Sequence, residues 1–401
     1  MELPGGGRLV EAVLSRTGTV VTVRGVDGTT RTVREDGPGP FDATSRLASV
    51  AYRADGPVLV ATTLHGETVE HDLDTGAEPA APPDGTPAVY LDQNKWSVLA
   101  DALHGTGRVP SGRESDAALT LAGWAEERRV ILPVSAAHLL ETVKWRDDDR
   151  RCVLGLTLAR LGRGWQLRHP LQVRHDELVD SLRRHLDPDA PPVARPAVTL
   201  QPGALLEDPA GPFPAAPETP WDRVHRALTA ASAHVDLLLD GRSTPPGPTG
   251  TWTAANRLFA DRLTSRGLDR NQTRKAVDAH IHNDLRHDID LAARTAGTTP
   301  DQTADWDRRL GARLAGTRSL AVWREAVHSR HANTGAAWHD NDLVDLVYLS
   351  CAAANTDLVV CERAMRAAVG QGLNRLGRPD NLHTSLHAAV EALRPLLRGG
   401  H

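Results

Sequence analysis

Cysteine, methionine, phenylalanine and tyrosine are scarce in this chain, with three, two, three and three copies among 401 residues. The cysteines Cys152, Cys351 and Cys361 form no CxxC pair and lie in apolar segments. This favours buried, reduced thiols and argues against a disulfide framework or a zinc finger. No apolar stretch approaches the roughly 20 residues of a membrane-spanning helix, and the first residues contain no apolar signal core. We therefore expect a cytoplasmic protein without membrane contact.

The overall composition, with 40% hydrophobic and 24% charged residues, is typical of a globular protein. The length allows two or three domains. A net charge of -5 does not by itself indicate a nucleic-acid-binding protein. Residues 128–184 nevertheless contain 12 lysines and arginines against 7 acidic residues, so a basic surplus is present locally.

The first 80 residues alternate polar and apolar side chains in the manner of β-strands. Residues 19–23 and 31–34 flank a turn signal at Asp27-Gly28, and residues 58–61 and 68–73 flank another at His65-Gly66. The pattern predicts two hairpins in a small antiparallel sheet, barrel or sandwich. We expect a small β-rich domain over residues 1–80, followed by a Pro-rich linker over residues 81–87.

After the linker, short apolar strands alternate with amphipathic helices, which is the pattern of a parallel sheet flanked by helices. Strands are expected at residues 89–91, 130–134, 358–361 and 382–383. A polar residue follows each strand directly: Asp92, Ser135, Glu362 and Thr384. Because the carboxyl ends of parallel strands lie at one sheet edge, these residues are expected to face a shared polar cleft. This α/β domain is predicted to comprise residues 88–186 and 335–401.

The middle of the chain interrupts the α/β pattern. Residues 187–250 contain 13 of the 27 prolines and are expected to form a surface connection, with regular structure resuming as a helix near residues 220–240. Residues 251–334 show helical periodicity and few strand signals. We expect a helical insertion within the α/β domain at this point.

Two acidic positions stand out in the first part of the α/β domain. Asp92 precedes an apolar helical pattern and is followed by Asn94. It is either a ligand-facing carboxylate at a strand end or an N-cap of the next helix. Glu141 lies near the buried edge of the helix after the second strand, where an unpaired carboxylate is costly.

Further acids lie at the equivalent places in the second part. Asp342 and Asp345 are three residues apart at a helix start and share one face, and Glu362 follows a strand. Carboxylates gathered at one sheet edge repel each other unless a hard divalent cation neutralises them, and oxygen ligands suit Mg²⁺ or Mn²⁺. Such ions favour phosphodiester hydrolysis, because they activate water and stabilise the leaving oxygen. The plainer alternative is that acids at helix starts only stabilise the helix dipole.

The run Tyr90-Leu91-Asp92-Gln93-Asn94 resembles the start of a PIN domain, the fold of many metal-dependent ribonucleases, including toxin components of toxin–antitoxin pairs. Glu141, residues 341–345 and residues 356–363 resemble the family's later acidic motifs and follow in the same order. The resemblance covers about residues 88–180 and 335–397 and implies a PIN-like parallel sheet. It also implies that four acids are catalytic and bind the metal, namely Asp92, Glu141, Asp342 and Glu362. Asp345 is implied as a further metal ligand and Asn94 as a supporting residue. The chain departs from the family in its large insertion and in having Glu362 where Asp is commoner.

Two other features of the insertion have competing interpretations. One helical face could offer zinc or iron four ligands, which are His280, Asp284, His287 and Asp288. The segment contains no HExxH motif, and with 18 histidines in the chain a solvated polar helix explains the cluster better. The insertion also has four tryptophans that could stack bases but are better explained as its core: Trp252, Trp306, Trp323 and Trp338.

These observations lead to one expectation and one alternative. We expect a metal-dependent endoribonuclease that cleaves RNA with Mg²⁺ or Mn²⁺, in a setting such as stress response, a toxin–antitoxin pair or defence. The N-terminal domain lacks clustered acids and is expected to bind an inhibitor or recruiting protein. The alternative is a catalytically inactive PIN-like module that binds nucleic acid or protein.

Overall fold

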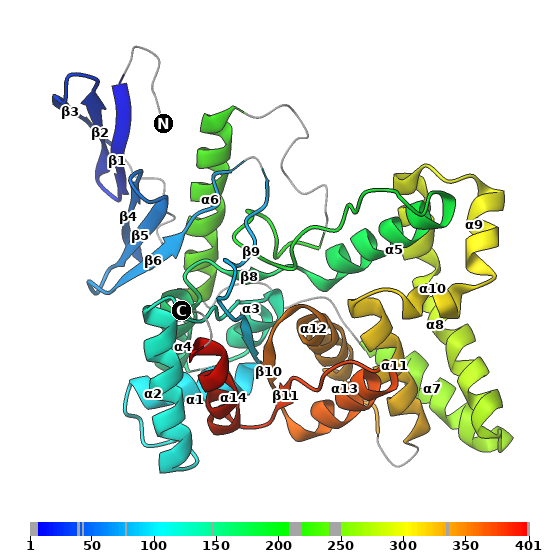
Figure 1. Ribbon diagram of the computed structural model, residues 1–401. Coiled ribbons are helices and arrows are strands. Elements are labelled where there is room, and N and C mark those ends of the chain that lie inside the picture. Colours follow the sequence, from blue (N-terminus) through cyan, green and yellow to red (C-terminus); the bar gives the residue numbers. More distant parts are fainter. Residues whose placement is uncertain are drawn as a thin grey trace.

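The computed structural model describes residues 7–37, 41, 44–76, 78–145, 147–207, 219–239, 250–333 and 337–398. The protein is a mixed α/β molecule with an N-terminal antiparallel sheet, a short parallel sheet and many helices (Figure 1). The N-terminal sheet and the helices of residues 250–307 lie at opposite ends, with the parallel sheet between them. Within the described residues, no helix combines the length and apolar character needed to cross a membrane.

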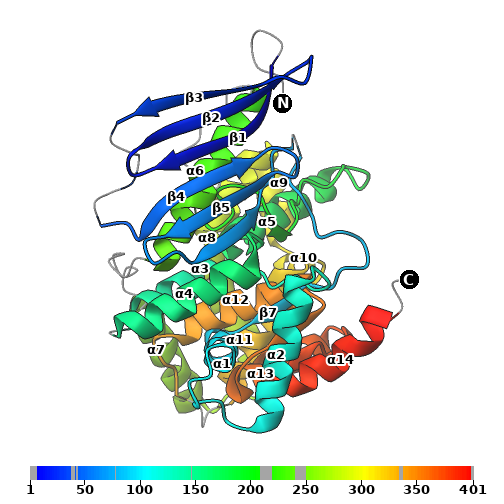
Figure 2. The ribbon, with the colours of Figure 1, turned by 90° about the vertical axis from the view of Figure 1, so that its left-hand side faces the viewer.

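The N-terminal part forms one six-stranded antiparallel sheet in the order β3-β2-β1-β4-β5-β6 (Figure 2). Its strands are β1 (Gly7–Ser15), β2 (Gly18–Gly25), β3 (Thr30–Asp36), β4 (Leu47–Arg53), β5 (Val58–Thr63) and β6 (Thr68–Asp72). Both predicted hairpins are present, as β2–β3 and β5–β6. The described strands form a single open sheet with β3 and β6 at its edges, so the expected barrel or sandwich does not form there.

The two halves of this sheet have different surroundings. Strand β3 is exposed along its whole length, whereas β4–β6 contribute buried apolar side chains such as Val50, Leu59 and Val69. Helices α4 (Asp148–Gly162) and α6 (Pro220–Leu239) cover the buried half. The two helices approach closely at Gly155, where a Cβ atom would lie 2.1 Å from the carbonyl oxygen of Leu238. Half of the sheet therefore shares one hydrophobic core with the α/β part.

The proline-rich stretch contains the predicted helix, which forms as α6. Pro220 is its first residue, a position where the missing amide hydrogen has no intrahelical partner in any case. A short strand, β9 (Val198–Thr199), pairs antiparallel with β8 (Gln166–Leu167). Residues 208–218 and 240–249 of the predicted connection lie outside the described residues.

The parallel sheet has three strands in the order β11-β10-β7, which are β11 (Leu382–His383), β10 (Leu358–Val360) and β7 (Val89–Leu91). The fourth strand predicted at residues 130–134 is not a strand in the described chain, because only two isolated parallel bridges form there, Ala88 with Ile131 and Val134 with Gln166. The parallel sheet is therefore narrower than the sequence predicted, and the full PIN-like sheet stays a prediction.

Both faces of the short sheet are buried, which explains its continuous apolar strands. Val89 and Leu91 belong to a core shared with α1 (Gln93–Leu103), α2 (Gly112–Glu126) and α14 (Leu386–Arg398). Tyr90 points into a second core. The helices of this second core include α5 (Pro170–Leu186), α11 (Ser319–Ala332), α12 (Asp342–Asn355) and α13 (Arg363–Arg375).

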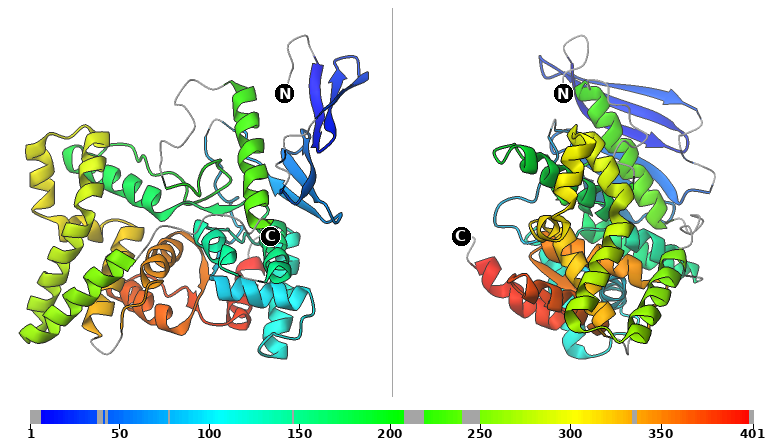
Figure 3. Two further views of the ribbon diagram at one scale, coloured as in Figure 1. Left: turned by 180° about the vertical axis from the view of Figure 1, so that it is seen from behind. Right: turned by 90° about the vertical axis from the view of Figure 1, so that its right-hand side faces the viewer.

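The helical insertion packs onto this second core. Its helices are α7 (Gly250–Arg266), α8 (Arg270–Ala296), α9 (Pro300–Asp307), α10 (Leu310–Ala315) and α11. Helix α11 packs against both α12 and α13, and α8 packs against α5 (Figure 3). Trp306, Trp323 and Trp338 are buried. The expectation that the insertion's tryptophans form its core is confirmed for these three.

Candidate active site

Strand pairing brings Asp92 and Glu362 to the same edge of the parallel sheet. Leu91 and Val360 are partners in the parallel register, and the amide of Asp92 donates to the carbonyl oxygen of Val360 at 2.9 Å. Asp92 then becomes the N-cap of α1, and Glu362 becomes the N-cap of α13. The sequence prediction that strand ends carry these two acids into one region is confirmed.

Asp92 has the N-cap role that its sequence position allowed. Its carboxylate caps α1 by accepting a hydrogen bond from the Gln93 amide at 2.8 Å. Burial raises the pKa of Asp92, the hydrogen bond from Gln93 opposes this, and the charge of Glu362 adds to the rise. The N-cap interpretation is therefore confirmed, and the same carboxylate lies within electrostatic reach of Glu362.

Glu141 reaches this region from α3 (Ala136–Val143). Ser135 and His138 form a capping box at the start of α3, and the His138 Nε2–H donates to the carbonyl oxygen of Leu91 at 2.8 Å. This bond ties α3 to the end of β7. Burial, followed by the charge of Asp92, raises the pKa of Glu141 to about 7. The carboxyl group of Glu141 is therefore partly protonated at neutral pH when no cation is bound.

Asp345, on the first turn of α12, has the strongest electrostatic connection to the other acids. Burial is the main cause that raises the pKa of Asp345 to about 8. The negative charges of Asp92, Glu141, Asp342 and Glu362 raise it further. Four segments of the chain that are distant in sequence therefore bring their carboxylates within electrostatic reach of one another.

Asp342 belongs to the same helix turn but is already neutralised. Its carboxylate forms an ion pair with Arg330 of α11 and accepts a hydrogen bond from the backbone amide of His339 at 2.8 Å. Both side chains of the ion pair are largely inaccessible, with 11% of Arg330 and 6% of Asp342 exposed. Asp342 therefore interacts with the other acids, but its carboxylate is paired with Arg330 of α11.

Two polar side chains of α1 make hydrogen bonds beside these acids. The side-chain amide of Asn94 donates a hydrogen bond to the Glu362 carboxylate. Lys95 donates from Nζ to the backbone carbonyl of Thr384 at 2.8 Å and joins α1 to the end of β11. We define the acidic cluster as Asp92, Glu141, Asp345 and Glu362.

The positions of the cluster also depend on four further residues, of which only Ser135 was expected at the cleft from the sequence: Gln93, Thr142, Tyr90 and Ser135. Gln93 donates from Nε2 to Thr142 Oγ1 at 2.9 Å, and Tyr90 exchanges a hydrogen bond with Ser135 at 3.0 Å. The ring of Tyr90 also stacks on His138. The Ser135-to-His138 spacing, a polar residue at the third helical position after a Ser cap, was the available signal for this scaffold.

The donor set fits a hard divalent cation by its chemistry. The cluster offers carboxylate oxygens, with the Asn94 amide adjacent to Glu362, and these are the ligand types of Mg²⁺ and Mn²⁺. Among the residues that the structure describes, no three acidic, histidine or cysteine side chains are arranged to hold one ion as they stand. A bound cation would therefore draw the carboxylates closer together, which their mutual repulsion opposes in its absence.

The rival histidine cluster on α8 has structural partners instead. His280 stacks on Phe259 with ring centroids 4.1 Å apart. Asp284 accepts from the Trp252 indole at 3.2 Å, and Asp288 pairs with Arg174 at 2.8 Å. Three of the four proposed ligands are therefore engaged in contacts within the protein, which favours the structural interpretation of this helix.

Comparisons of the chain with protein-family models, with curated proteins and with solved structures found no match. The chemistry of the acidic cluster must therefore be inferred from its own residues.

Proposed function

We propose that this protein is a metal-dependent nuclease of the PIN-like type that hydrolyses phosphodiester bonds in RNA with Mg²⁺ or Mn²⁺. The observation that supports this most is the electrostatic coupling of Asp345 to three other acids from separate segments. Folding has gathered these charges although their repulsion destabilises the metal-free protein. Groups whose pKa values are strongly perturbed by burial and by each other cluster at functional sites.

The residues assigned to hold the ions are Asp92, Glu141, Asp345 and Glu362, with Asn94 orienting Glu362. Asp342 has a secondary role, because Arg330 neutralises its charge. Bound ions of this class activate water and stabilise the oxygen that leaves phosphorus. In the metal-free protein Glu141 and Asp345 retain protons near neutral pH, so ion binding is expected to release protons.

Substrate and partners follow from the resemblance to PIN domains and are proposed on that basis alone. RNA is the substrate class, and stress response, a toxin–antitoxin pair or defence is the setting. The exposed edge strand β3 of the N-terminal sheet is a suitable surface for an inhibitor or a recruiting protein, because an exposed edge strand can pair with another chain.

The decisive experiment replaces Asp92 by Asn. Asn can still accept the hydrogen bond from the Gln93 amide, so α1 keeps its cap while the cluster loses a charge. We expect Asp92→Asn to lower the rate of RNA cleavage with Mn²⁺ by at least about a hundredfold, with an unchanged or higher melting temperature in chelator. Glu362→Gln should behave alike.

A matched control is His282→Ala. His282 pairs with Asp307 at 2.9 Å in the helical insertion and should leave cleavage unchanged. Wild-type cleavage by Asp92→Asn would show that the nuclease assignment is wrong. In that case the inactive binding module would become the better account of the fold.

A further inference from the structure

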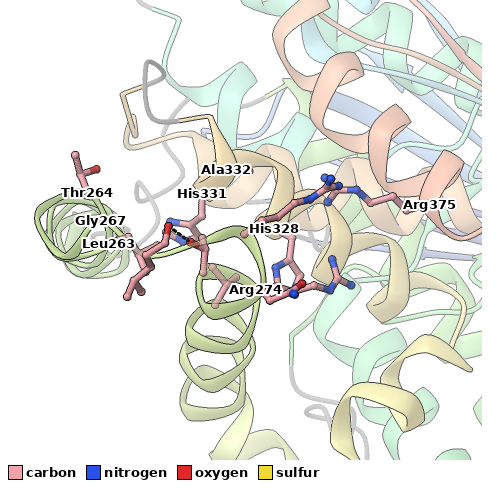
Figure 4. Close-up of a pocket in the computed structure, with 13 residues that line it drawn as sticks. Leu263, Thr264, Gly267, Arg274, His328, His331, Ala332 and Arg375 are labelled. Carbon is pink, nitrogen blue, oxygen red and sulfur yellow. Dashed lines mark hydrogen bonds between the residues drawn. The ribbon is translucent and has the colours of Figure 1, made fainter.

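A cavity of about 620 Å³ lies in the helical part, separate from the acidic cluster (Figure 4). Its walls come from α7, α8, α11 and the end of α13. The volume is in the range of sites for small organic ligands. Apolar side chains cover part of the wall, and they include Leu263, Leu268 and Val277.

The polar part of the wall is basic. Arg270, Arg274 and Arg375 line the cavity together with His328 and His331. Among the described residues that line it, none carries a carboxylate. An anionic group would therefore meet cationic donors and no repelling acid inside this cavity.

Two nearby acids, Glu325 and Asp278, neutralise part of this charge. The buried Glu325 carboxylate pairs with Arg274 at 2.5 Å, with Arg324 at 2.7 Å and with Arg375 at 3.7 Å, and Asp278 pairs with Arg324 at 2.6 Å. Arg375 is the most distant of the three and is partly exposed. Two carboxylates facing three guanidinium groups leave positive charge available to a ligand, chiefly at Arg375.

The start of α8 also lies at the cavity. The helix runs for 27 residues from Arg270, and both Arg270 and Asn271 of its first turn line the cavity. Asp269 caps this helix by accepting a hydrogen bond from the Gln272 amide at 2.8 Å, so its carboxylate already offsets the positive end of the helix dipole. The preference of the cavity for anions therefore comes from its arginine side chains.

A buried imidazole nitrogen gives independent support for a ligand with a hydrogen-bond donor. His331 Nε2–H donates to Asn256 Oδ1 at 3.0 Å, which leaves Nδ1 as the acceptor atom. This Nδ1 is buried and has no hydrogen-bond partner within the described residues. A hydroxyl or amino group of a ligand next to His331 would satisfy it.

We propose that this cavity binds a small phosphate monoester of nucleotide size, with its phosphate held by Arg270 and Arg375. The rest of the ligand lies against the apolar wall and presents a hydroxyl or amino group towards His331. This binding is independent of the proposed nuclease, because the cavity lining contains none of the four acids of the cluster.

Isothermal titration calorimetry of the full chain in excess EDTA tests the proposal, with adenosine monophosphate as the probe. We expect one molecule to bind per chain, and both inorganic phosphate and adenosine to bind more weakly. Arg270→Gln and Arg375→Gln should each weaken the affinity by at least about tenfold, because each removes a charged donor to the phosphate. Arg308→Gln, at an exposed side chain outside the cavity lining, should leave the affinity unchanged.

Three results would overturn the proposal. They are no binding of adenosine monophosphate by the wild-type protein, equal binding of adenosine, and unchanged affinity in both cavity variants while circular dichroism shows that they fold. Because EDTA removes divalent ions, each of these results would leave the nuclease proposal untouched. Conversely, an inactive but adenosine-monophosphate-binding protein would refute the nuclease and support this site.

Discussion

Asp342 and Asp345 lie less than one turn apart on α12, yet their surroundings differ. Asp342 pairs with the buried guanidinium of Arg330. Asp345 instead lies within the influence of Asp92, Glu141 and Glu362. Their spacing places both on one helix face, but only the position of α11 decides which carboxylate is neutralised. The resemblance to PIN domains favoured Asp342 as the principal ligand, whereas the geometry favours Asp345.

The two aspartates therefore should respond differently to substitution. Asp342→Asn leaves the buried Arg330 without its ionic partner, and breaking a buried ion pair costs about 3 kcal/mol of unfolding free energy. Asp345→Asn removes a repelled charge and should not destabilise the metal-free protein. Urea denaturation in chelator measures both effects. Equal stability of the two variants would show that the Arg330 pair does not stabilise the fold and that Asp342 is available as a ligand.

At the level of elements, the site is formed by the starts of α1, α12 and α13 and by the middle of α3. Each helix supplies one acid, and the sheet aligns only two of them, Asp92 and Glu362. Helices α3 and α12 are placed by packing, with α3 tied to β7 through His138 and α12 held against α11. The four acids are therefore brought together by the packing of these helices as well as by the pairing of the strands.

This packing predicts a pH dependence of stability in the absence of metal. Folding raises the pKa of Asp345 from its ordinary value to about 8, so the folded state binds more protons than the unfolded state between about pH 4 and pH 8. The stability that this group contributes is complete below about pH 4 and is lost as the pH rises towards 8. Relative to wild type, Asp345→Asn should gain several degrees in melting temperature between about pH 5 and pH 8.

Differential scanning calorimetry across this pH range checks the prediction, and the difference between variant and wild type isolates Asp345 from the buried histidines that titrate in acid. Excess Mn²⁺ should remove this difference in melting temperature at high pH. The ion stabilises the wild-type protein, whose cluster keeps all its carboxylates, more than it stabilises the Asp345→Asn variant. A difference in melting temperature that does not change with pH would contradict the proposed coupling.

For the molecule as a whole, the N-terminal sheet is divided between two roles. Strands β4–β6 bury apolar side chains against α4 and α6, while β3 is exposed throughout. Arg163 at the end of α4 also pairs with Glu70 at 3.2 Å and with Asp72 at 3.4 Å. The N-terminal sheet is therefore packed against the α/β part and is not joined to it through residues 81–87 alone.

Truncation at two positions should separate these roles. A chain that lacks residues 1–43 loses β1–β3 and should still unfold cooperatively and cleave RNA, because β4–β6 remain against α6. A chain that lacks residues 1–80 exposes the apolar faces of α4 and α6 and should aggregate. Size-exclusion chromatography, thermal unfolding and a cleavage assay measure the outcome. A soluble, active chain without residues 1–80 would show that the shared core is dispensable.

The sequence by itself determined the local features, because they depend on near neighbours. The alternation in residues 19–34, the cap at Asp92 and the acids that follow the two strands could be read from periodicity and helix-start chemistry. The tertiary structure alone decided the rest. Of the sheet, barrel or sandwich that the sequence allowed, the N-terminal strands form an open sheet, and residues 130–134 form two bridges instead of a strand. Packing also pairs Asp342 with Arg330 and leaves Asp345 surrounded by other acids. These outcomes depend on burial and on contacts between residues far apart in the chain, which no local pattern specifies.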